Sequence, residues 1–136
     1  MGLEIVATNS RDGLADAGAV VTGLPIGLRG SEIDPLPLRD DVVLLPLDYA
    51  SSVGAGLART CTVWSDDVEQ FAAVAPVKLG EDYPLATDWT GARLDGPRPP
   101  GRLLVQNLGN AASDIVLAAE VAAEAERQGL GTLLPL

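Results

Sequence analysis

Short apolar runs, separated by polar or Gly- and Pro-containing segments, recur along the chain, and each has the length of a β-strand. The pattern predicts strands at residues 3–7, 19–22, 42–47, 61–64 and 103–106. The run VVLLPL at 42–47 does not alternate apolar with polar positions, which is typical of a central strand that is buried on both faces of a parallel sheet. Because Pro46 lacks an N–H, we expect the strand ladder to weaken there.

Helical signals lie between these strands. The polar cluster at 8–12 predicts a short helix over 12–17, and Asp66 and Asp67 open an apolar helical spacing through residue 75. Residues 111–128 form the longest predicted helix, which Gly129 ends. One face of this helix is built of small side chains, and such a face lets a helix lie close to a sheet or to another helix. Segments 26–40 and 79–101 are rich in glycine and proline and are predicted to be loops.

Strands that alternate with helices indicate one α/β domain over residues 1–136 with a mostly parallel sheet. In such sheets, ligands bind beyond the carboxyl ends of the strands. We therefore look for functional side chains where the predicted strands end.

The amino-acid composition limits the partners, the location and the reactions that we expect for this chain. Nineteen acidic against nine basic residues give a net charge of −10, which disfavours nucleic acid as a partner. No apolar stretch is long enough to span a membrane and no basic leader segment is visible, so we expect a cytoplasmic protein. The chain has no histidine and one cysteine, Cys61, which excludes histidine-based catalysis, an internal disulfide and a multi-cysteine metal site. Carboxylates, hydroxyls, the backbone or a cofactor must therefore carry any reaction, and we expect no metal.

Small or polar residues stand at three predicted strand ends: the pair at 22–23, Asp48, and residues 107–109. Gly109 and Asn110 also precede the long helix, whose first N–H groups favour anions. Each has a structural alternative, because residues 22–23 can simply end a strand, Asp48 can cap a turn and Asn110 can cap the helix.

Residues 54–59, GAGLAR, are similar to the start of a dinucleotide-binding fingerprint. Arg59 stands where the third glycine is needed, and Asp66 follows too closely to be the ribose ligand. The chain thus has the later strands of a nucleotide-binding sheet without the glycine-rich loop that holds the pyrophosphate.

Four stretches resemble the ornithine cyclodeaminase/mu-crystallin family. Residues 17–25, AGAVVTGLP, look like the family's GADIVVTATP strand, and LLPLD at 44–48 falls where the family has a strand ending in its active-site aspartate. LLVQNLGNAASD at 103–114 is similar to ITVFDSTGLAIQD, and QGLGTLLPL at 128–136 closely resembles the family ending GIGTxLPL. The stretches keep the family's order along essentially the whole chain.

The resemblance implies a fold in which a substrate and dimerisation domain precedes a Rossmann domain that binds NAD(P). This chain would be the later part of that Rossmann domain plus the C-terminal helix: a partial Rossmann-like, mostly parallel sheet without its first strands. Residues 3–7 would be the third strand, left without its normal neighbour. We expect this segment to drift, pair aberrantly or borrow a partner.

The resemblance also implies site residues. Asp48 would be the catalytic carboxylate near the nicotinamide and the substrate amine, and the cofactor, NAD or NADP, would be approached by Thr22, Gly23, Leu24, Asn107 and Gly109. Pro46-Leu47 replace the Gly-Gly or Ala-Gly that the family often has before the aspartate, and residues 106–109 replace its Asp-Ser-Thr-Gly. Another amino or imino acid is therefore as good a substrate as ornithine.

The implied function is that of an NAD(P)-dependent enzyme acting on the α-carbon–nitrogen bond of an amino or imino acid: a cyclodeaminase, a ketimine reductase or an amino-acid dehydrogenase. We expect the chain to be a truncated or split member that is inactive alone, with a second copy or a complementing N-terminal chain as partner. The alternatives are a non-catalytic partner subunit and a fragment without independent function.

Overall fold

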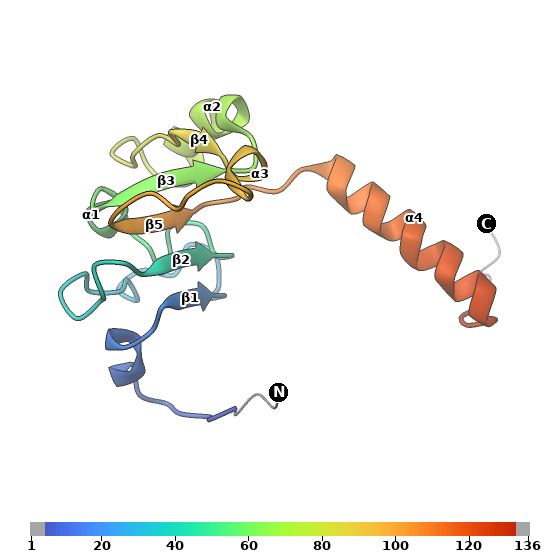
Figure 1. Cartoon of the computed structure of the whole chain (residues 1–136), viewed down its shortest axis with the longest axis horizontal. Coiled ribbons are helices and arrows are strands. Elements are labelled where there is room, and N and C mark those ends of the chain that lie inside the picture. Colours follow the sequence, from blue (N-terminus) through green and yellow to red (C-terminus); the bar gives the residue numbers. More distant parts are fainter. Residues whose placement is uncertain (1–4, 133–136) are drawn as a thin grey trace.

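A computed structural model describes residues 5–132 and contains one five-stranded sheet, all of whose strands run parallel (Figure 1). The strands are β1 (Ala19–Thr22), β2 (Val43–Pro46), β3 (Cys61–Ser65), β4 (Asp88–Trp89) and β5 (Arg102–Val105), in the spatial order β1-β2-β5-β3-β4. The helical elements are the 3₁₀ turn η1 (Asp12–Ala15), α1 (Ala55–Ala58), α2 (Val68–Lys78), α3 (Thr90–Arg93) and α4 (Ala111–Gln128). The predicted α/β class and parallel sheet are confirmed, and the fold is a partial Rossmann-like one.

The core is an aliphatic row that runs across the sheet. The strand registers place Val20 beside Leu44, Leu44 beside Leu104, and Leu104 beside Val63, and all four side chains are buried. Phe71 and Ala75 of α2 lie one helical turn apart and are buried in the same cluster. Aliphatic side chains and one phenylalanine thus supply most of the core, as the low aromatic content requires.

Strand β2 lies inside the sheet, but only one of its faces is fully buried. Leu44 and Pro46 are buried, Val43 and Leu45 are half-buried, and Leu47 just beyond the strand is 74% exposed. The prediction that both faces are buried is therefore wrong for the second face.

The ladder weakens at Pro46 on one side only. The N–H groups of Val43 and Leu47 donate to carbonyls of the β1 segment, so the missing N–H of Pro46 is on the β5 side. The pairing of β2 with β5 accordingly ends at Leu44, whereas its pairing with β1 continues to Pro46.

The predicted strand at 3–7 does not form within the described residues. Residues 3–4 lie outside them, and residues 5–7 have no regular structure and are exposed. A strand needs a neighbour for its backbone hydrogen bonds, and none pairs with this segment. The predicted helix at 12–17 is reduced to the η1 turn, and the predicted loop at 79–101 contains β4 and α3.

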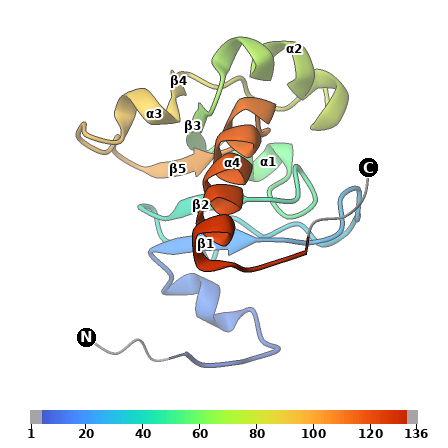
Figure 2. The same cartoon turned by 90° about the vertical axis from the view of Figure 1, so that its right-hand side faces the viewer.

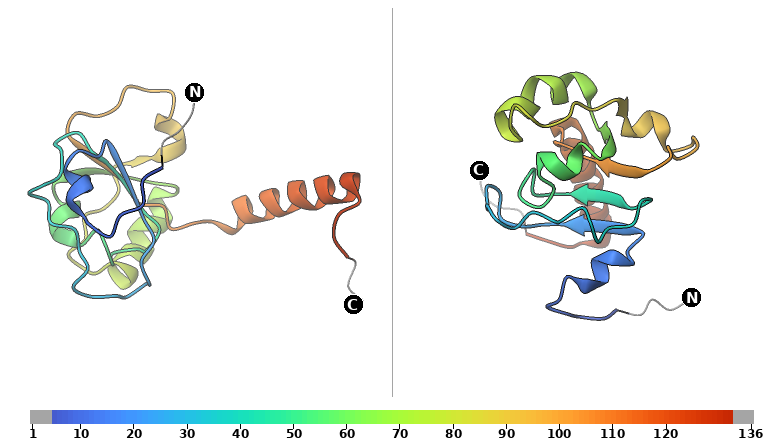
Figure 3. Two further views of the ribbon diagram at one scale, coloured as in Figure 1. Left: turned by 90° about the horizontal axis from the view of Figure 1, so that it is seen from below. Right: turned by 90° about the vertical axis from the view of Figure 1, so that its left-hand side faces the viewer.

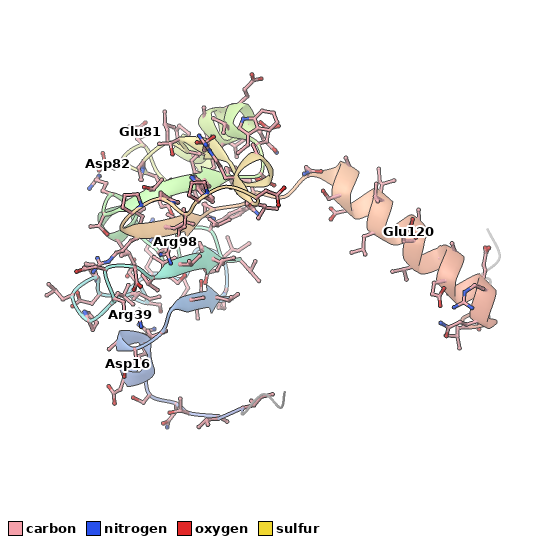
Figure 4. All side chains as sticks on the ribbon, in the orientation of Figure 1. Asp16, Arg39, Glu81, Asp82, Arg98 and Glu120 are labelled. Carbon is pink, nitrogen blue, oxygen red and sulfur yellow. The ribbon has the colours of Figure 1, made fainter. Side chains whose placement is uncertain are left out.

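Local sequence signals set both ends of α4, but the helix packs on little of the rest of the described chain. The side chain of Asn110 accepts a hydrogen bond from the Ser113 amide (2.9 Å), and Gly129 ends the helix with φ +66°. In Figure 1 and in the left view of Figure 3 the helix projects away from the sheet, and in Figure 2 it is seen in front of the sheet. Figure 4 shows its side chains, Glu120 among them, away from the body. None of its residues is buried. The small-residue face that we expected to pack on a sheet or helix is therefore uncovered among the described residues.

No helix in the part of the chain that the structure describes is both long and apolar enough to cross a membrane.

Candidate functional site

The carboxyl edge of the sheet brings together polar side chains from four adjacent strands. Thr22 ends β1, Asp48 follows β2, Gln106 follows β5, and Ser65 and Asp66 lie at the end of β3. All except Thr22 and Asp66 are buried. This is the edge at which parallel α/β sheets bind ligands.

Asp48 is the centre of the first cluster and is completely buried. Its Oδ2 accepts a hydrogen bond from the Leu24 amide (2.9 Å), and its Oδ1 accepts one from the Ser52 hydroxyl (2.8 Å). Ser52 Oγ lies 2.5 Å from Thr22 Oγ1; because Ser52 uses its only hydrogen on Asp48, Thr22 is the donor. The carboxylate therefore fastens the segment after β1 to the turn after β2.

The neighbouring serine fixes the next part of the same loop. Ser51 Oγ accepts a hydrogen bond from the Gly27 amide (3.0 Å) and donates one to the Pro25 carbonyl (3.1 Å). Asp48 and Ser51 together hold residues 24–27 in one conformation.

A cavity of about 410 Å³ lies beside the end of β1. Its wall includes Thr22, Gly23 and Leu24, together with Arg11 and Ser31. A Cβ built on Gly23 would meet nothing within 4 Å, so this position is next to open space. Three of the five predicted cofactor-binding residues therefore line one cavity.

Asp66 forms a second cluster that the sequence reasoning did not anticipate. Its carboxylate accepts hydrogen bonds from the amides of Leu108 (3.0 Å) and Gly109 (2.8 Å) and from the Ser65 hydroxyl (3.1 Å). The sequence predicts that both Asp66 and Asp67 open α2, but only Asp67 caps it, through the Gln70 amide. The signal that identifies Asp66 is its position directly after a strand, at the edge where the loop before α4 begins.

The predicted site residues, taken together, are divided between the two sides of this edge. Asn107 Oδ1 accepts a hydrogen bond from the Thr90 hydroxyl (3.3 Å), and Gly109, with φ +81°, donates its amide to Asp66. Asn107 and Gly109 therefore lie on the β5–β3 side of the edge, whereas Asp48, Thr22 and Leu24 form the β1–β2 side.

Gln106 is a buried polar side chain between the two clusters. Its Oε1 accepts a hydrogen bond from the Tyr83 hydroxyl (3.0 Å), while its Nε2 has no hydrogen-bond partner among the described residues. The Tyr83 hydroxyl is the donor because the Gln106 Oε1 atom can only accept, and burial raises the pKa of this phenol.

The described residues fit only part of an NAD(P) site. The Leu24 and Gly109 amides already donate to carboxylates and are not offered to a pyrophosphate. Within residues 54–59, Ala55–Ala58 form the helix α1, and residues 47–54 separate this helix from β2. In the fingerprint, the first glycine directly follows the strand, so residues 54–59 do not have its arrangement. The open space at Gly23 can receive part of a ligand, but no phosphate-binding loop accompanies it in the described chain.

No group of three side chains able to hold a metal ion occurs within residues 5–132.

Comparison with models of known protein families and with curated protein sequences found no match. Among solved structures, the chain is similar to "Crystal structure of CmnK", with a TM-score of 0.69 and 21% sequence identity. The similarity covers 95% of this chain but 42% of that one, so this chain spans less than half the length of its structural neighbour. At this identity, the likeness shows the fold alone.

Proposed function

We propose that this chain is the C-terminal portion of an NAD(P)-dependent enzyme that acts on the α-carbon–nitrogen bond of an amino or imino acid. The substrate and the nicotinamide would lie at the carboxyl edge of the sheet, and a preceding N-terminal portion, in the same or a separate polypeptide, would supply the pyrophosphate-binding loop. The observation that carries the proposal is the Asp48–Ser52–Thr22 network beside the β1 cavity.

The outer edge of β1 supports an incomplete sheet. The Gly18 and Thr22 carbonyls accept bonds from the β2 segment, so the N–H and C=O groups of Ala19 and Val21 point to the opposite side. Both residues are exposed, and no strand pairs there within residues 5–132. An unpaired parallel edge beside a cavity is where additional strands of the same sheet would be added.

Helix α4 supports the same proposal from the other end of the chain. Ile115, Val116, Leu117 and Val121 are each at least 60% exposed, on a helix that keeps no side chain buried. A helix with apolar residues over most of its surface is normally covered by protein. More than half of the CmnK chain lies outside the similarity, which is enough length to supply both the strands and this cover.

In the proposed site, Asp48 exchanges a proton with the substrate nitrogen or with water. Both of its oxygens are engaged in this structure, by Leu24 and Ser52, so one of these bonds must open before the carboxylate can reach a substrate. Opening the bond to the Leu24 amide would free Oδ2, and opening the bond to the Ser52 hydroxyl would free Oδ1.

The test combines this chain with the polypeptide encoded immediately upstream. We expect the chain alone to bind NAD⁺ and NADP⁺ with dissociation constants weaker than about 1 mM, because no loop holds the pyrophosphate. The mixture should bind one of them in the micromolar range and should convert an amino or imino acid from a panel. A dehydrogenase would reduce the cofactor, a ketimine reductase would oxidise its reduced form, and a cyclodeaminase would release ammonia with no net change in the cofactor. Tight cofactor binding by the chain alone would contradict the incomplete site, and a stable mixed complex without turnover would contradict the enzymatic proposal.

A non-catalytic partner subunit is the second candidate. It is favoured by the complete burial of Asp48, which in this structure holds a loop and faces no solvent. In that case, Asp48→Asn would lower the stability of the mixed complex without changing its turnover.

A further inference from the structure

A second pocket, of about 340 Å³, lies on the other side of the loop that Ser51 holds through the Gly27 amide. It is enclosed by the loop at 26–32, the turn at 49–51, the start of α1 and the end of α2. Neither Asp48 nor any of the five predicted cofactor-binding residues lines it. Its volume is in the range of small-molecule sites.

Unpaired charges gather in this pocket. Five of the nine basic side chains make ion pairs with carboxylates, and Arg98 bonds the Asp41 and Gly101 carbonyls. Figure 4 shows two of these six, Arg39 and Arg98, near the amino ends of the strands. Within residues 5–132, the three basic side chains that have no such partner are Arg11, Arg29 and Lys78. Arg29 and Lys78 both line this pocket, as does Glu32, which also makes no ion pair there.

The pocket is held in shape before any ligand arrives. The loop that carries Arg29 and Glu32 is fixed at one end by Ser51, through the Gly27 amide, and at the other by the Ile33 amide on the Ser52 carbonyl (2.8 Å). A loop that is already ordered does not lose that entropy on binding.

The backbone is strained at the same place. Tyr49, which lines the pocket, has φ +55°, in the left-handed region that bulky residues rarely adopt. Such conformations persist where the surroundings enforce them and are concentrated at ligand sites.

We propose that this pocket binds a small acidic amino acid. The two carboxylates of the ligand would lie on Arg29 and Lys78, and its ammonium group on Glu32, so that two positive and one negative side chain are matched by two negative and one positive group. The exposed side chains of Ile26 and Leu28 lie beside these charges and would cover the aliphatic part of the ligand. The site does not depend on the proposed enzymatic function.

The test is an NMR titration of the full chain with L-glutamate. We expect amide shifts at Gly27 and Gly54, with a dissociation constant of about 1 mM or tighter, and no shift at Gly23. Arg29→Gln and Lys78→Gln should each weaken binding about tenfold, the loss of one charge-assisted pair. Arg11→Gln is the matched control, because it removes the same charge from the other cavity and should leave binding unchanged.

Glutarate, which lacks the ammonium group, separates the role of Glu32. Glutarate should bind less tightly than L-glutamate, and Glu32→Gln should weaken only L-glutamate. All substituted side chains are exposed, so the variants should fold, which the dispersion of the same spectra checks. The proposal is overturned if L-glutamate causes no shift at about 10 mM. It is also overturned if Arg29→Gln and Lys78→Gln bind like the control, or if glutarate binds as tightly as L-glutamate.

Discussion

Replacing Asp48 by alanine tests whether this carboxylate holds the carboxyl edge of the sheet together. The substitution removes both acceptors of the network, leaving the Leu24 amide and the Ser52 hydroxyl without their partner. The side chain is fully buried, so water does not readily replace it.

The magnitude follows from these two bonds. A hydrogen bond to a charged group contributes about 1.5–3 kcal/mol, so the gross loss is about 3–6 kcal/mol. Relief from burying a charge offsets part of it, which leaves a net loss of about 3 kcal/mol in the free energy of unfolding. For a chain of this length that corresponds to a fall of roughly 10 °C in Tm.

Asp48→Asn should cost less, about 1–2 kcal/mol, because the amide keeps one oxygen acceptor and can donate to Ser52 Oγ. Asp95→Ala is the matched control: it removes a carboxylate that is exposed and makes no hydrogen bond or ion pair within the described chain.

Urea unfolding followed by circular dichroism measures the three free energies, and thermal melts check them. We expect the order of destabilisation Asp48→Ala, then Asp48→Asn, then Asp95→Ala, with the control within about 0.5 kcal/mol of the unsubstituted chain. Equal stability of Asp48→Ala and Asp95→Ala would refute the argument that the buried network stabilises the fold. In that case the Asp48 carboxylate would have no role in stability, and only a role in the reaction would be left for it.

Three further predictions concern Asp66, Tyr83 and Cys61. Asp66→Ala removes the acceptor of two amides in the loop before α4, and hydrogen exchange at these amides should accelerate about tenfold or more, while amides in the strands stay protected. Tyr83→Phe leaves the buried Oε1 of Gln106 without its donor and should lower the free energy of unfolding by about 1–3 kcal/mol; an unchanged urea midpoint would contradict this. Burial raises the pKa of the Cys61 thiol, so less thiolate is present at any pH below it. Alkylation of Cys61 should therefore be slower than that of a free thiol at pH 8 and should increase with pH up to a midpoint above about 8.5.

Several elements were predictable because their signals are local. Asn110 and Gly129 bound α4 through a side-chain cap and a left-handed residue, and both act within one helical turn. The apolar runs that became β1, β2, β3 and β5 were likewise recognisable, because a strand in a buried sheet must be apolar over its own length. The parallel direction of the strands was predictable from the alternation of strands and helices.

The strand expected at residues 3–7 was wrong over residues 5–7 because a strand, unlike a helix, bonds to a neighbour that its own sequence does not contain. The uncovered surface of α4 has the same cause, since the small-residue pattern specifies a face but not what lies on it.

In the candidate site, too, the sequence predicts some features and only the tertiary structure determines the others. The sequence alone placed Asp48 and residues 22–23 at strand ends, because strand ends are local features. Only the tertiary structure decided that the Asp48 carboxylate is buried against Leu24 and Ser52, and that Asp66 bonds to an amide at residue 109, 43 positions away along the chain. Which residues far apart in the sequence become hydrogen-bond partners depends on the order of the strands in the sheet. That order is a property of the whole sheet and not of any single segment.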